Sequence, residues 1–474
     1  MLTREQNETI TRVGADTPGG KLLRLYWQPV ALVEELASSR PVRPVRVLGQ
    51  DFVLFKDAEG KVALMDRDCP HRGADLSYGR LEANGLRCPF HGWLFDAQGN
   101  CLETPGEPPH VRLCDKVKQK TYPVVERSGI YFAYLGEAGK SGEGDTPPDA
   151  PPPTPSTPPT TRPAALPAFP NFDCFAAPAT HTFAFKGLLG CNWVQALEVG
   201  IDPAHASFLH RFFEDEDPGA DPALAYGKQF RAASAGSQWP MTKVMREYPA
   251  PEIGFEDAPW GLRVTALRHV DPHATPPVTH VRVTNLVFPQ AFVIPLSAEM
   301  TITQWHVPVD DTACYWYAIF TSFAAPVDQA QMRAQRLELY TLPDYIPRVG
   351  RHNRYGYNAA EQAGQTYTGM GFDINVHDQW AVESQGRIAD RTREHLGTTD
   401  KVIIAYRKLL MRAIKDAQSG ATPCMVLSAD DAARINGPVT VDGICEGADW
   451  QAYWRAFDAE RRAGASWPAP DCKP

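Results

Sequence analysis

Two short arms of the chain each carry one cysteine and one histidine. The first arm reads Cys-Pro-His from Cys69 to His71, and the second reads Cys-Pro-Phe-His from Cys88 to His91. Two thiolates and two imidazoles can hold a zinc ion or the two irons of a [2Fe–2S] cluster. Either site requires the two arms to meet in space, so the segment that contains them must fold around a metal centre.

The distribution of the ligand types favours the cluster over zinc. Zinc sites usually pair cysteine with cysteine and histidine with histidine, whereas each arm here has one of each and is followed by a glycine. Cys69 and Cys88 can bind one iron while His71 and His91 bind the other. The pattern C-x-H then C-x₂-H, with the string CPFHGW from Cys88, resembles the Rieske [2Fe–2S] domain at the spacing of ring-hydroxylating oxygenases.

The residues beside the arms indicate which Rieske class the chain resembles. Respiratory-chain Rieske proteins carry an extra cysteine in or beside each arm and join the two in a disulfide, but the matching places here are Ala74 and Phe90. A cluster without a disulfide suits a reducing cytoplasm and a low-potential oxygenase. The cysteines outside the arms show no motif, and we expect free thiols.

Composition describes a folded enzyme of ordinary charge. The chain has 474 residues, 43% of them hydrophobic and 22% charged, which is enough for two or three cored domains. Its net charge of −9 and the lack of a dense Lys/Arg run argue against nucleic acid or an anionic membrane as partner. No apolar stretch approaches the roughly 18 residues of a membrane span, so we expect a cytoplasmic protein.

Turn residues and prolines divide the chain. Short alternating runs between Val45 and Leu135, separated by Gly and Asp turns, predict a small all-β domain that holds both arms on loops. The Gly-, Ser-, Thr- and Pro-rich residues 139–170 predict an extended tether. The predicted parts are an N-terminal helical segment (1–24), the cluster domain (25–138), the linker (139–170), a catalytic domain (171–420) and a C-terminal extension (421–474).

A second possible metal site follows the linker. Asp202-Pro203 predicts a helix start with the aspartate as N-cap, which places it near His205. His205 and His210 lie about 140° apart on an ideal helix, so an irregular turn is needed for both to reach one metal. Two histidines and one carboxylate form the facial triad of non-haem Fe(II) oxygenases.

The chemistry alone leaves the third ligand open among Asp373, Asp378, Glu383 and Asp390. The whole chain resembles the α-only Rieske non-haem iron oxygenases of the phthalate dioxygenase type. The resemblance rests on YWQPV from Tyr26, VPVDDT from Val307 and VHDQW from Val376, besides the two arms. It implies that Asp378 is the carboxylate ligand.

The rest of the pattern predicts an α+β fold. Alternating runs at 260–270, 279–288, 300–307 and 314–323 predict an antiparallel sheet with a turn at Asp310-Asp311. Residues 401–417 predict an amphipathic helix that stops at Gly420. These agree with the helix-grip catalytic domain that the resemblance implies. We expect four other histidines to be ordinary packing or polar residues: His269, His280, His306 and His352.

The resemblance also implies the activity. A separate reductase, with flavin and iron–sulfur centres, passes electrons from NAD(P)H to the cluster and on to the mononuclear Fe(II), which activates O₂ beside an aromatic substrate. Transfer runs between neighbouring subunits, so the resemblance implies a homo-oligomer built on trimers. It also implies that Asp202 bridges to His91 of the adjacent subunit.

The resemblance favours an aromatic carboxylate, such as a phthalate or benzoate, and cis-dihydroxylation. Monooxygenation or O- or N-demethylation uses the same ligands and remains the alternative, and an electron-transfer Rieske protein would need no second iron. Cations in the region expected to line the pocket are Lys243, Arg246, Arg263 and Arg268, although each of them could equally be a surface charge.

Overall fold

The fold is described from a computed structural model that covers residues 1–108, 110–136, 166–215 and 239–470. Most of the predicted linker, residues 139–165, lies outside the described residues. Among the described helices, none is long and apolar enough to cross a membrane.

The chain begins with two short helices, α1 (Arg4–Thr11) and α2 (Pro18–Leu23). Thr3 and Gln6 form a capping box at the start of α1, and Pro18 begins α2, where its missing N–H costs nothing. Small antiparallel sheets follow, with the strand orders β1-β11-β10, β2-β3-β4-β9 and β5-β6-β7-β8. Their strands are β1 (Trp27–Leu32), β2 (Val42–Val47), β3 (Gln50–Lys56), β4 (Val62–Asp66), β5 (Arg80–Glu82), β6 (Gly85–Arg87), β7 (Leu94–Phe95), β8 (Cys101–Glu103), β9 (Thr121–Tyr122), β10 (Val124–Arg127) and β11 (Ile130–Tyr134).

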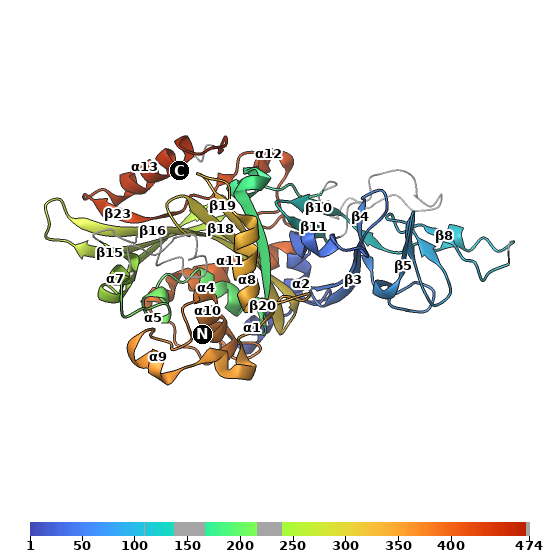
Figure 1. Cartoon of the computed structure of the whole chain (residues 1–474), viewed down its shortest axis with the longest axis horizontal. Helices are drawn as coiled ribbons and strands as arrows, with labels where there is room; N and C mark the ends of the chain where they lie inside the picture. Colours follow the sequence, from blue (N-terminus) through green and yellow to red (C-terminus); the bar gives the residue numbers. More distant parts are fainter. Residues whose placement is uncertain (109, 137–165, 216–238, 471–474) are drawn as a thin grey trace.

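The outer two of these sheets hold the cysteine–histidine arms. The first arm lies between β4 and the 3₁₀ turn η2 (Leu76–Tyr78), and the second joins β6 to β7. Both cysteines belong to a small apolar core of their own, which includes Phe55, Leu86 and Phe95. The arms therefore start from rigid strands and end at one end of the molecule, on the right in Figure 1.

The second half is built on one antiparallel sheet, which in the described residues has eight strands. Its path is β13-β19-β18-β17-β16-β15-β14, and β23 also pairs with β16. The four predicted strand runs coincide with β15, β16, β18 and β19, and Asp311-Thr312 form the turn between the last two. The strands are β13 (Thr182–Leu189), β14 (Glu252–Ala258), β15 (Gly261–Asp271), β16 (Val278–Val287), β17 (Ala291–Pro295), β18 (Met300–Asp310), β19 (Ala313–Ser322) and β23 (Val441–Glu446).

Helices cover both faces of this sheet (Figure 1). On one face lie α4 (Trp193–Gly200), α10 (Ile374–Ser384) and α11 (Lys401–Ser419), and on the other lies α13 (Trp450–Ala463). The predicted helix end at Gly420 is confirmed, because this glycine takes a left-handed φ of 79°. The remaining helices and short strands are α3 (Asp173–Ala176), α5 (Ala206–Leu209), α7 (Met241–Glu247), α8 (Gln329–Leu339), α9 (Ala359–Gly364), α12 (Ala429–Ala432), β12 (Asn171–Phe172), β20 (Tyr340–Thr341), β21 (Ile346–Pro347) and β22 (Asn436–Gly437).

Every residue of β16 is buried, because the sheet is covered on both faces. Val281 and Val283 pack with Trp454 of α13, as their alternation predicts. Arg282 and Thr284 point to the opposite face, where they line a pocket. The polar half of the alternating pattern therefore faces the interior of the protein.

The two halves share one core. In the turn between β2 and β3, Leu48 N donates to Pro308 O at 2.8 Å and Gly49 N donates to Val309 O at 2.9 Å. These two hydrogen bonds join the turn to β18 of the second half. The predicted α+β class is confirmed: an all-β part is followed by a part of sheet and helices. The domain boundaries stay predictions, and β23 from beyond residue 420 belongs to the main sheet.

Candidate metal centres

The two cysteine–histidine arms have the same backbone turn. Cys69 N donates to Ala74 O at 2.8 Å and Gly73 N donates back to Cys69 O at 2.8 Å. In the second arm Cys88 N donates to Trp93 O at 2.8 Å, and the N–H of the following glycine donates to Cys88 O at 3.0 Å. Both arms thus present their cysteine and histidine side chains from matching turns.

The two arms bring their side chains face to face. The His71 and His91 rings are 4.5 Å apart at 68°, and Trp93 stacks on His71 at 4.3 Å. Nδ1 of His91 is buried and has no hydrogen-bond partner among the described residues. Burial and the neighbouring His71 and Arg72 lower the pKa of His91, which favours the neutral imidazole that binds metal.

The two thiols complete a donor set that fits a cluster. Burial raises the pKa of Cys69 to about 11, and the nearby Cys88 thiol adds to this, while backbone N–H groups of His71 and Arg72 favour the thiolate. Buried sulfur that is costly to ionise becomes a thiolate when a metal supplies the opposite charge. The paired thiols, the two imidazoles and the unpartnered nitrogen of His91 fit a Rieske [2Fe–2S] centre.

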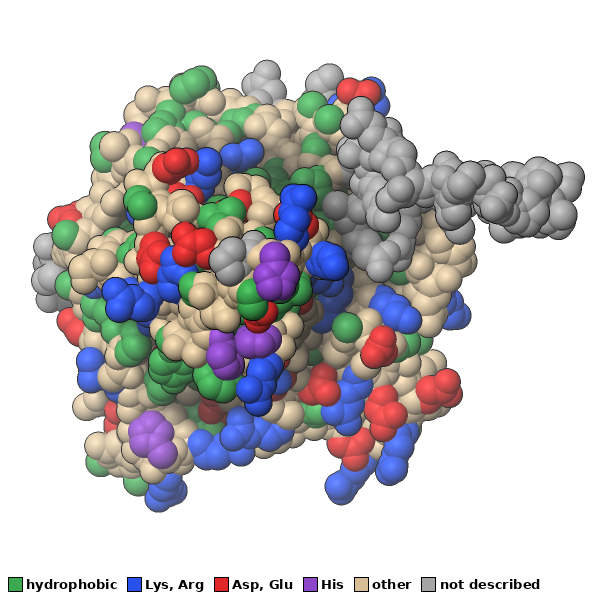
Figure 2. Space-filling model, turned by 90° about the vertical axis from the view of Figure 1, so that its right-hand side faces the viewer, with side chains coloured by type: hydrophobic (Ala, Val, Ile, Leu, Met, Phe, Trp, Pro, Cys, Tyr) green, Lys and Arg blue, Asp and Glu red, His purple; other side chains and the backbone are tan. Residues whose placement is uncertain are grey.

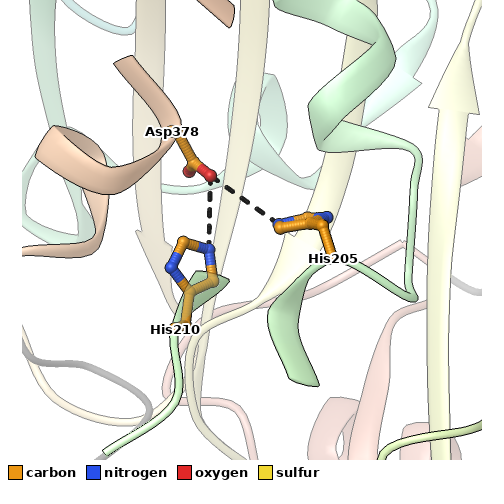
Figure 3. Close-up of side chains that lie close together, drawn as sticks. All are labelled: His205, His210 and Asp378. Carbon is orange, nitrogen blue, oxygen red and sulfur yellow. Dashed lines mark ion pairs between the residues drawn. The ribbon is translucent and has the colours of Figure 1, made fainter. Parts of the chain in front are cut away.

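A second group of donors meets beside α10. Nε2 of His210 lies 3.2 Å from Asp378 Oδ1, and Nε2 of His205 lies 3.7 Å from the same oxygen (Figure 3). One ligand atom from each residue can be chosen so that all three lie within 4.8 Å of one another. The structure therefore brings together the two histidines and the carboxylate that the resemblance singled out.

The helix start predicted at Asp202 is wrong. The helix α5 begins at Ala206, with His205 just before it and His210 just after it. Asp202 Oδ1 instead accepts from Ala204 N at 2.8 Å, which closes a tight turn before the helix. A single helical turn between the two histidines is the irregularity that lets both rings face one point, with ring centroids 5.1 Å apart.

The other candidate carboxylates have different partners. Asp373 caps α10 by accepting from Asn375 N at 2.9 Å. Glu383 accepts from Gly190 N and from Tyr355 Oη, both at 2.8 Å. Asp390 is exposed and accepts from Thr392. Of the four, Asp378 is the one that faces the imidazoles.

The electrostatics of the triad suit a divalent cation. Burial acts to raise the pKa of Asp378, but the adjacent His210 and His205 imidazoles outweigh it and lower the pKa overall. Burial lowers the pKa of His205, so its imidazole is neutral near pH 7. Among the described residues, Asp378 Oδ1 has no hydrogen-bond partner although it is buried. Two nitrogen donors and one charged oxygen fit the two-histidine, one-carboxylate site of Fe(II).

Comparisons with known proteins give the family. Residues 26–123 match the Rieske [2Fe–2S] domain model, and residues 163–467 match the model described as LigXa C-terminal domain like. The chain is 32% identical to the phthalate 4,5-dioxygenase oxygenase subunit of Pseudomonas putida, over 97% of both chains. The chain belongs to the Rieske oxygenases.

Two more distant comparisons agree with this assignment. The 5,5'-dehydrodivanillate O-demethylase oxygenase subunit of Sphingobium is 30% identical, over 90% of this chain and 84% of the other. The solved structure of NdmA from Pseudomonas putida CBB5 has the same fold, with a TM-score of 0.52 at 17% identity over 91% of this chain and 99% of that one. As a Rieske oxygenase component, the protein is an oxidoreductase with a Rieske cluster and a mononuclear iron, and O₂ is its co-substrate.

A pocket of this Rieske oxygenase opens beside the triad. Apolar side chains such as Phe292, Ile294 and Trp316 form part of its wall. Its other polar lining residues include Arg282, Thr284, Gln304, His306, Asn375 and Gln379. His306, which we expected to be an ordinary packing or polar residue, lies in the wall of this pocket, and burial lowers its pKa to about 3.

The four basic residues named from the sequence do not line this pocket. Arg246 pairs with Asp215, Arg263 pairs with Glu256, and Lys243 lies over the Trp239 ring. Arg268 is buried behind the wall and donates to Ser207 Oγ at 2.9 Å. The arginine in the wall is Arg282, which lies in the predicted strand run 279–288 and was not singled out from the sequence. Arg282 alternates with the valines of β16 and shares a face with Thr284. This alternation is the feature of the sequence that could have indicated its place in the wall.

The cluster end has a mixed surface. His71 and His91 are partly exposed, and Phe90 beside them is 56% exposed. Figure 2 views the molecule from this end, and it shows histidine, basic and apolar side chains gathered near the middle of the face. The two arm histidines, which are the candidate cluster ligands, thus lie close to the surface of the molecule.

Proposed function

We propose that this Rieske oxygenase hydroxylates an aromatic carboxylate by cis-dihydroxylation, with O₂ and electrons from a separate reductase. The observation that carries the substrate class is the buried cation Arg282 in the wall of the pocket beside the triad. A buried guanidinium is the group best suited to hold a carboxylate, because it donates two parallel hydrogen bonds.

The charged groups behind the wall gather around Asp442. Arg282 and His280 both contact Asp442, and Arg268 lies near the same carboxylate. Burial lowers the pKa of His280, so it is neutral near pH 7. Burial lowers the pKa of Arg268 to about 10, which still leaves it charged. Two guanidinium groups therefore lie beside the carboxylate of Asp442, and this cationic region would attract the carboxylate of a substrate.

The apolar wall supports an aromatic ring next to that anion. Phe292, Ile294 and Trp316 offer the flat, apolar contact that a ring requires. Two relatives are named for aromatic carboxylates, the phthalate 4,5-dioxygenase and 3-chlorobenzoate-3,4-dioxygenase oxygenase subunits. O-demethylation is the second candidate outcome, because the dehydrodivanillate relative is an O-demethylase of the same family.

Each ligand set has a defined task in the proposed reaction. Cys69, Cys88, His71 and His91 would hold the cluster, and His205, His210 and Asp378 would hold the mononuclear iron. With these metals bound, the centres supply one-electron transfer and O₂ activation. The protein itself orients the ring beside the triad, holds the carboxylate at Arg282 and keeps water from the apolar side of the pocket.

We propose that the working protein is a homo-oligomer built on trimers, in which Asp202 bridges to His91 of the adjacent subunit. A surface groove beside His205 supports this arrangement. It is lined by exposed apolar side chains, including Phe208, Tyr367 and Trp380. The partly exposed cluster face carries Phe90, so both surfaces have apolar area to bury on association.

The test is turnover of matched charged and neutral substrates. A panel of benzoates, phthalates and methoxybenzoates is compared with the corresponding amides in the presence of a reductase, and O₂ uptake and products are measured. We expect ring-hydroxylated products from at least one carboxylate and none from its amide. A demethylated methoxybenzoate would favour the second outcome, and turnover of amides alone would contradict the proposed substrate class.

Arg282→Met tests the residue that carries the proposal. Loss of a charge-assisted hydrogen bond of about 1.5–3 kcal/mol predicts a KM for the carboxylate raised roughly 10- to 150-fold. Arg263→Met is the matched control, since Arg263 is a buried cation that lies outside the pocket lining. Equal effects of the two substitutions on KM would contradict a substrate contact at Arg282.

A further inference from the structure

The histidine next to the triad aspartate is buried against one of the triad imidazoles. His377 precedes Asp378 on α10, and its side chain has no exposed surface. Its Nδ1 lies 3.4 Å from Nδ1 of His210, and the two rings are 5.6 Å apart at 22°. His377 thus contacts the nitrogen of His210 that faces away from Asp378.

The other nitrogen of His377, Nε2, lies next to a backbone carbonyl oxygen, which can only accept a hydrogen bond. Nε2 of His377 lies 2.9 Å from Gly371 O. A carbonyl oxygen can only accept, so Nε2 carries the proton. Gly371 is itself held in place, because its N–H donates to Glu361 Oε1 at 2.8 Å. The orientation of the His377 ring is therefore set from outside the triad.

This contact fixes the tautomer of both rings. A neutral imidazole protonated at Nε2 has a bare lone pair at Nδ1, so Nδ1 of His377 is an acceptor. The hydrogen bond between the two rings then requires the proton on Nδ1 of His210. Nε2 of His210 is left as a lone pair, and it is the atom that faces Asp378 at 3.2 Å.

We propose that His377 is a positioning residue that holds His210 in the tautomer and ring orientation required to bind the mononuclear iron. This rests on the proposed role of His210 as an iron ligand. A metal-bound histidine normally donates its second N–H to an acceptor, and loss of that acceptor typically weakens metal binding 10- to 100-fold. His205 has the equivalent contact with a backbone atom, at 2.5 Å between its Nδ1 and Asp202 O.

The acceptor for the His210 N–H is the imidazole of His377, which is neither a carboxylate nor a carbonyl group. Imidazole brings no negative charge, so it orients the ligand without adding a second anion beside Asp378. The contact of 3.4 Å is long for a hydrogen bond, which places the expected effect at the low end of the range.

The test compares His377→Asn with His377→Leu. The two side chains have nearly the same shape, but asparagine keeps an acceptor near the position of Nδ1 and leucine does not. Fe(II) affinity of the mononuclear site is measured by chelator competition in the full-length protein, with the visible spectrum of the Rieske cluster as a check on folding. We expect leucine to weaken Fe(II) binding by about 10-fold and asparagine to weaken it by no more than about 3-fold.

Three controls make the result decisive. His181→Leu replaces another buried histidine, which contacts Thr180 and Ser466, and should leave Fe(II) affinity unchanged. If His377→Leu fails to fold, His377→Phe takes its place, because it fills the ring volume without an acceptor. His210→Ala should lose the iron outright.

Equal affinities of the asparagine and leucine variants, whether both normal or both weakened, would overturn the positioning role. Failure of His210→Ala to lose iron would instead overturn the proposed ligand set. The two proposals can therefore fail separately.

Discussion

Asp378 illustrates how a single carboxylate can be recognised from its partners. Asp373 and Glu383 lie on or next to the same helix, but backbone N–H groups of the protein satisfy them. Asp378 Oδ1 has no such donor among the described residues and faces two imidazole nitrogens. One carboxylate oxygen and two imidazole nitrogens that converge in this way are the donor set that Fe(II) prefers.

The matched pair Asp378→Asn and Glu383→Gln tests this assignment. We expect Asp378→Asn to lose most of its mononuclear iron and its turnover, because two imidazoles and a neutral amide hold Fe(II) weakly. The Rieske spectrum should be unchanged. Glu383→Gln should keep its iron, and iron analysis showing the reverse order would contradict the choice of carboxylate.

Asp202 offers a second test at the same scale. Its Oδ1 accepts from Ala204 N, and asparagine can make the same bond while it removes the charge. We predict that Asp202→Asn folds, binds both metal centres and is reduced normally, yet passes electrons from the cluster far too slowly for turnover. Stopped-flow reoxidation with substrate and O₂ measures this step, and a wild-type rate would exclude the bridging role.

The sequence predicts residues well where their partners are local. The two arms are short motifs, so their four candidate ligands could be named before the fold was known. His377 and Arg282 could not, because their partners Gly371, His210 and Asp442 are determined by how helices and strands pack. The cap predicted at Asp202 is wrong because Asp202 lies three residues before His205, the residue at the N-cap position, and its side chain closes a turn with Ala204 instead.

Among the elements, the two arms depend on glycine for their common turn. Gly73 and Gly92 both take a positive φ, at 74° and 77°, which is costly for other residues. A Cβ at Gly92 would also lie 2.8 Å from Pro105 Cγ, whereas a Cβ at Gly73 would meet nothing within 4 Å. A substitution at either glycine would therefore strain the backbone, but only a substitution at Gly92 would also produce a steric clash.

Gly92→Ala and Gly73→Ala therefore form a matched pair. Each should cost about 1 kcal/mol or more through backbone strain. Gly92→Ala should cost more and should lose its cluster faster when exposed to a chelator, because Pro105 must move. Cluster absorbance over time compares them, and faster loss in Gly73→Ala would contradict this account of the arm.

The sequence predicts where the strands of the main sheet lie, but it does not predict which of their faces are buried. Alternation located β15, β16, β18 and β19, because apolar side chains on one face recur every second residue. It could not show that the polar face of β16 is also buried. The pocket lies on that face. In the sequence its polar residues cannot be told from residues that face solvent, because the helices that cover them come from distant parts of the chain.

At the scale of the molecule, a buried ion pair joins the two halves. Lys186 of β13 and Glu35 of η1 (Val33–Leu36) lie 2.7 Å apart, and each side chain is under a tenth exposed. Burial lowers the pKa of Lys186, and Glu35 partly offsets this. Tyr315, Tyr317 and Tyr345 surround the ammonium group.

Glu35→Gln should destabilise the protein by about 3–5 kcal/mol, because it leaves the lysine charge buried without its partner. Lys186→Met combined with Glu35→Gln should recover much of that loss, since no charge then remains buried. Denaturant unfolding of the three proteins measures it. A double variant less stable than Glu35→Gln alone would contradict this view of the interface.

In the proposed reaction, electrons from the cluster reach the triad, where they would be used to reduce O₂, and O₂ would oxidise an aromatic carboxylate held at Arg282. The most direct test is a single turnover of the fully reduced protein with ¹⁸O₂ and the panel of benzoates and phthalates, followed by mass analysis of the products. We predict cluster reoxidation that depends on substrate, with two ¹⁸O atoms in a dihydrodiol carboxylate. Reoxidation that is indifferent to every carboxylate and leaves the whole panel unchanged would contradict the proposed reaction.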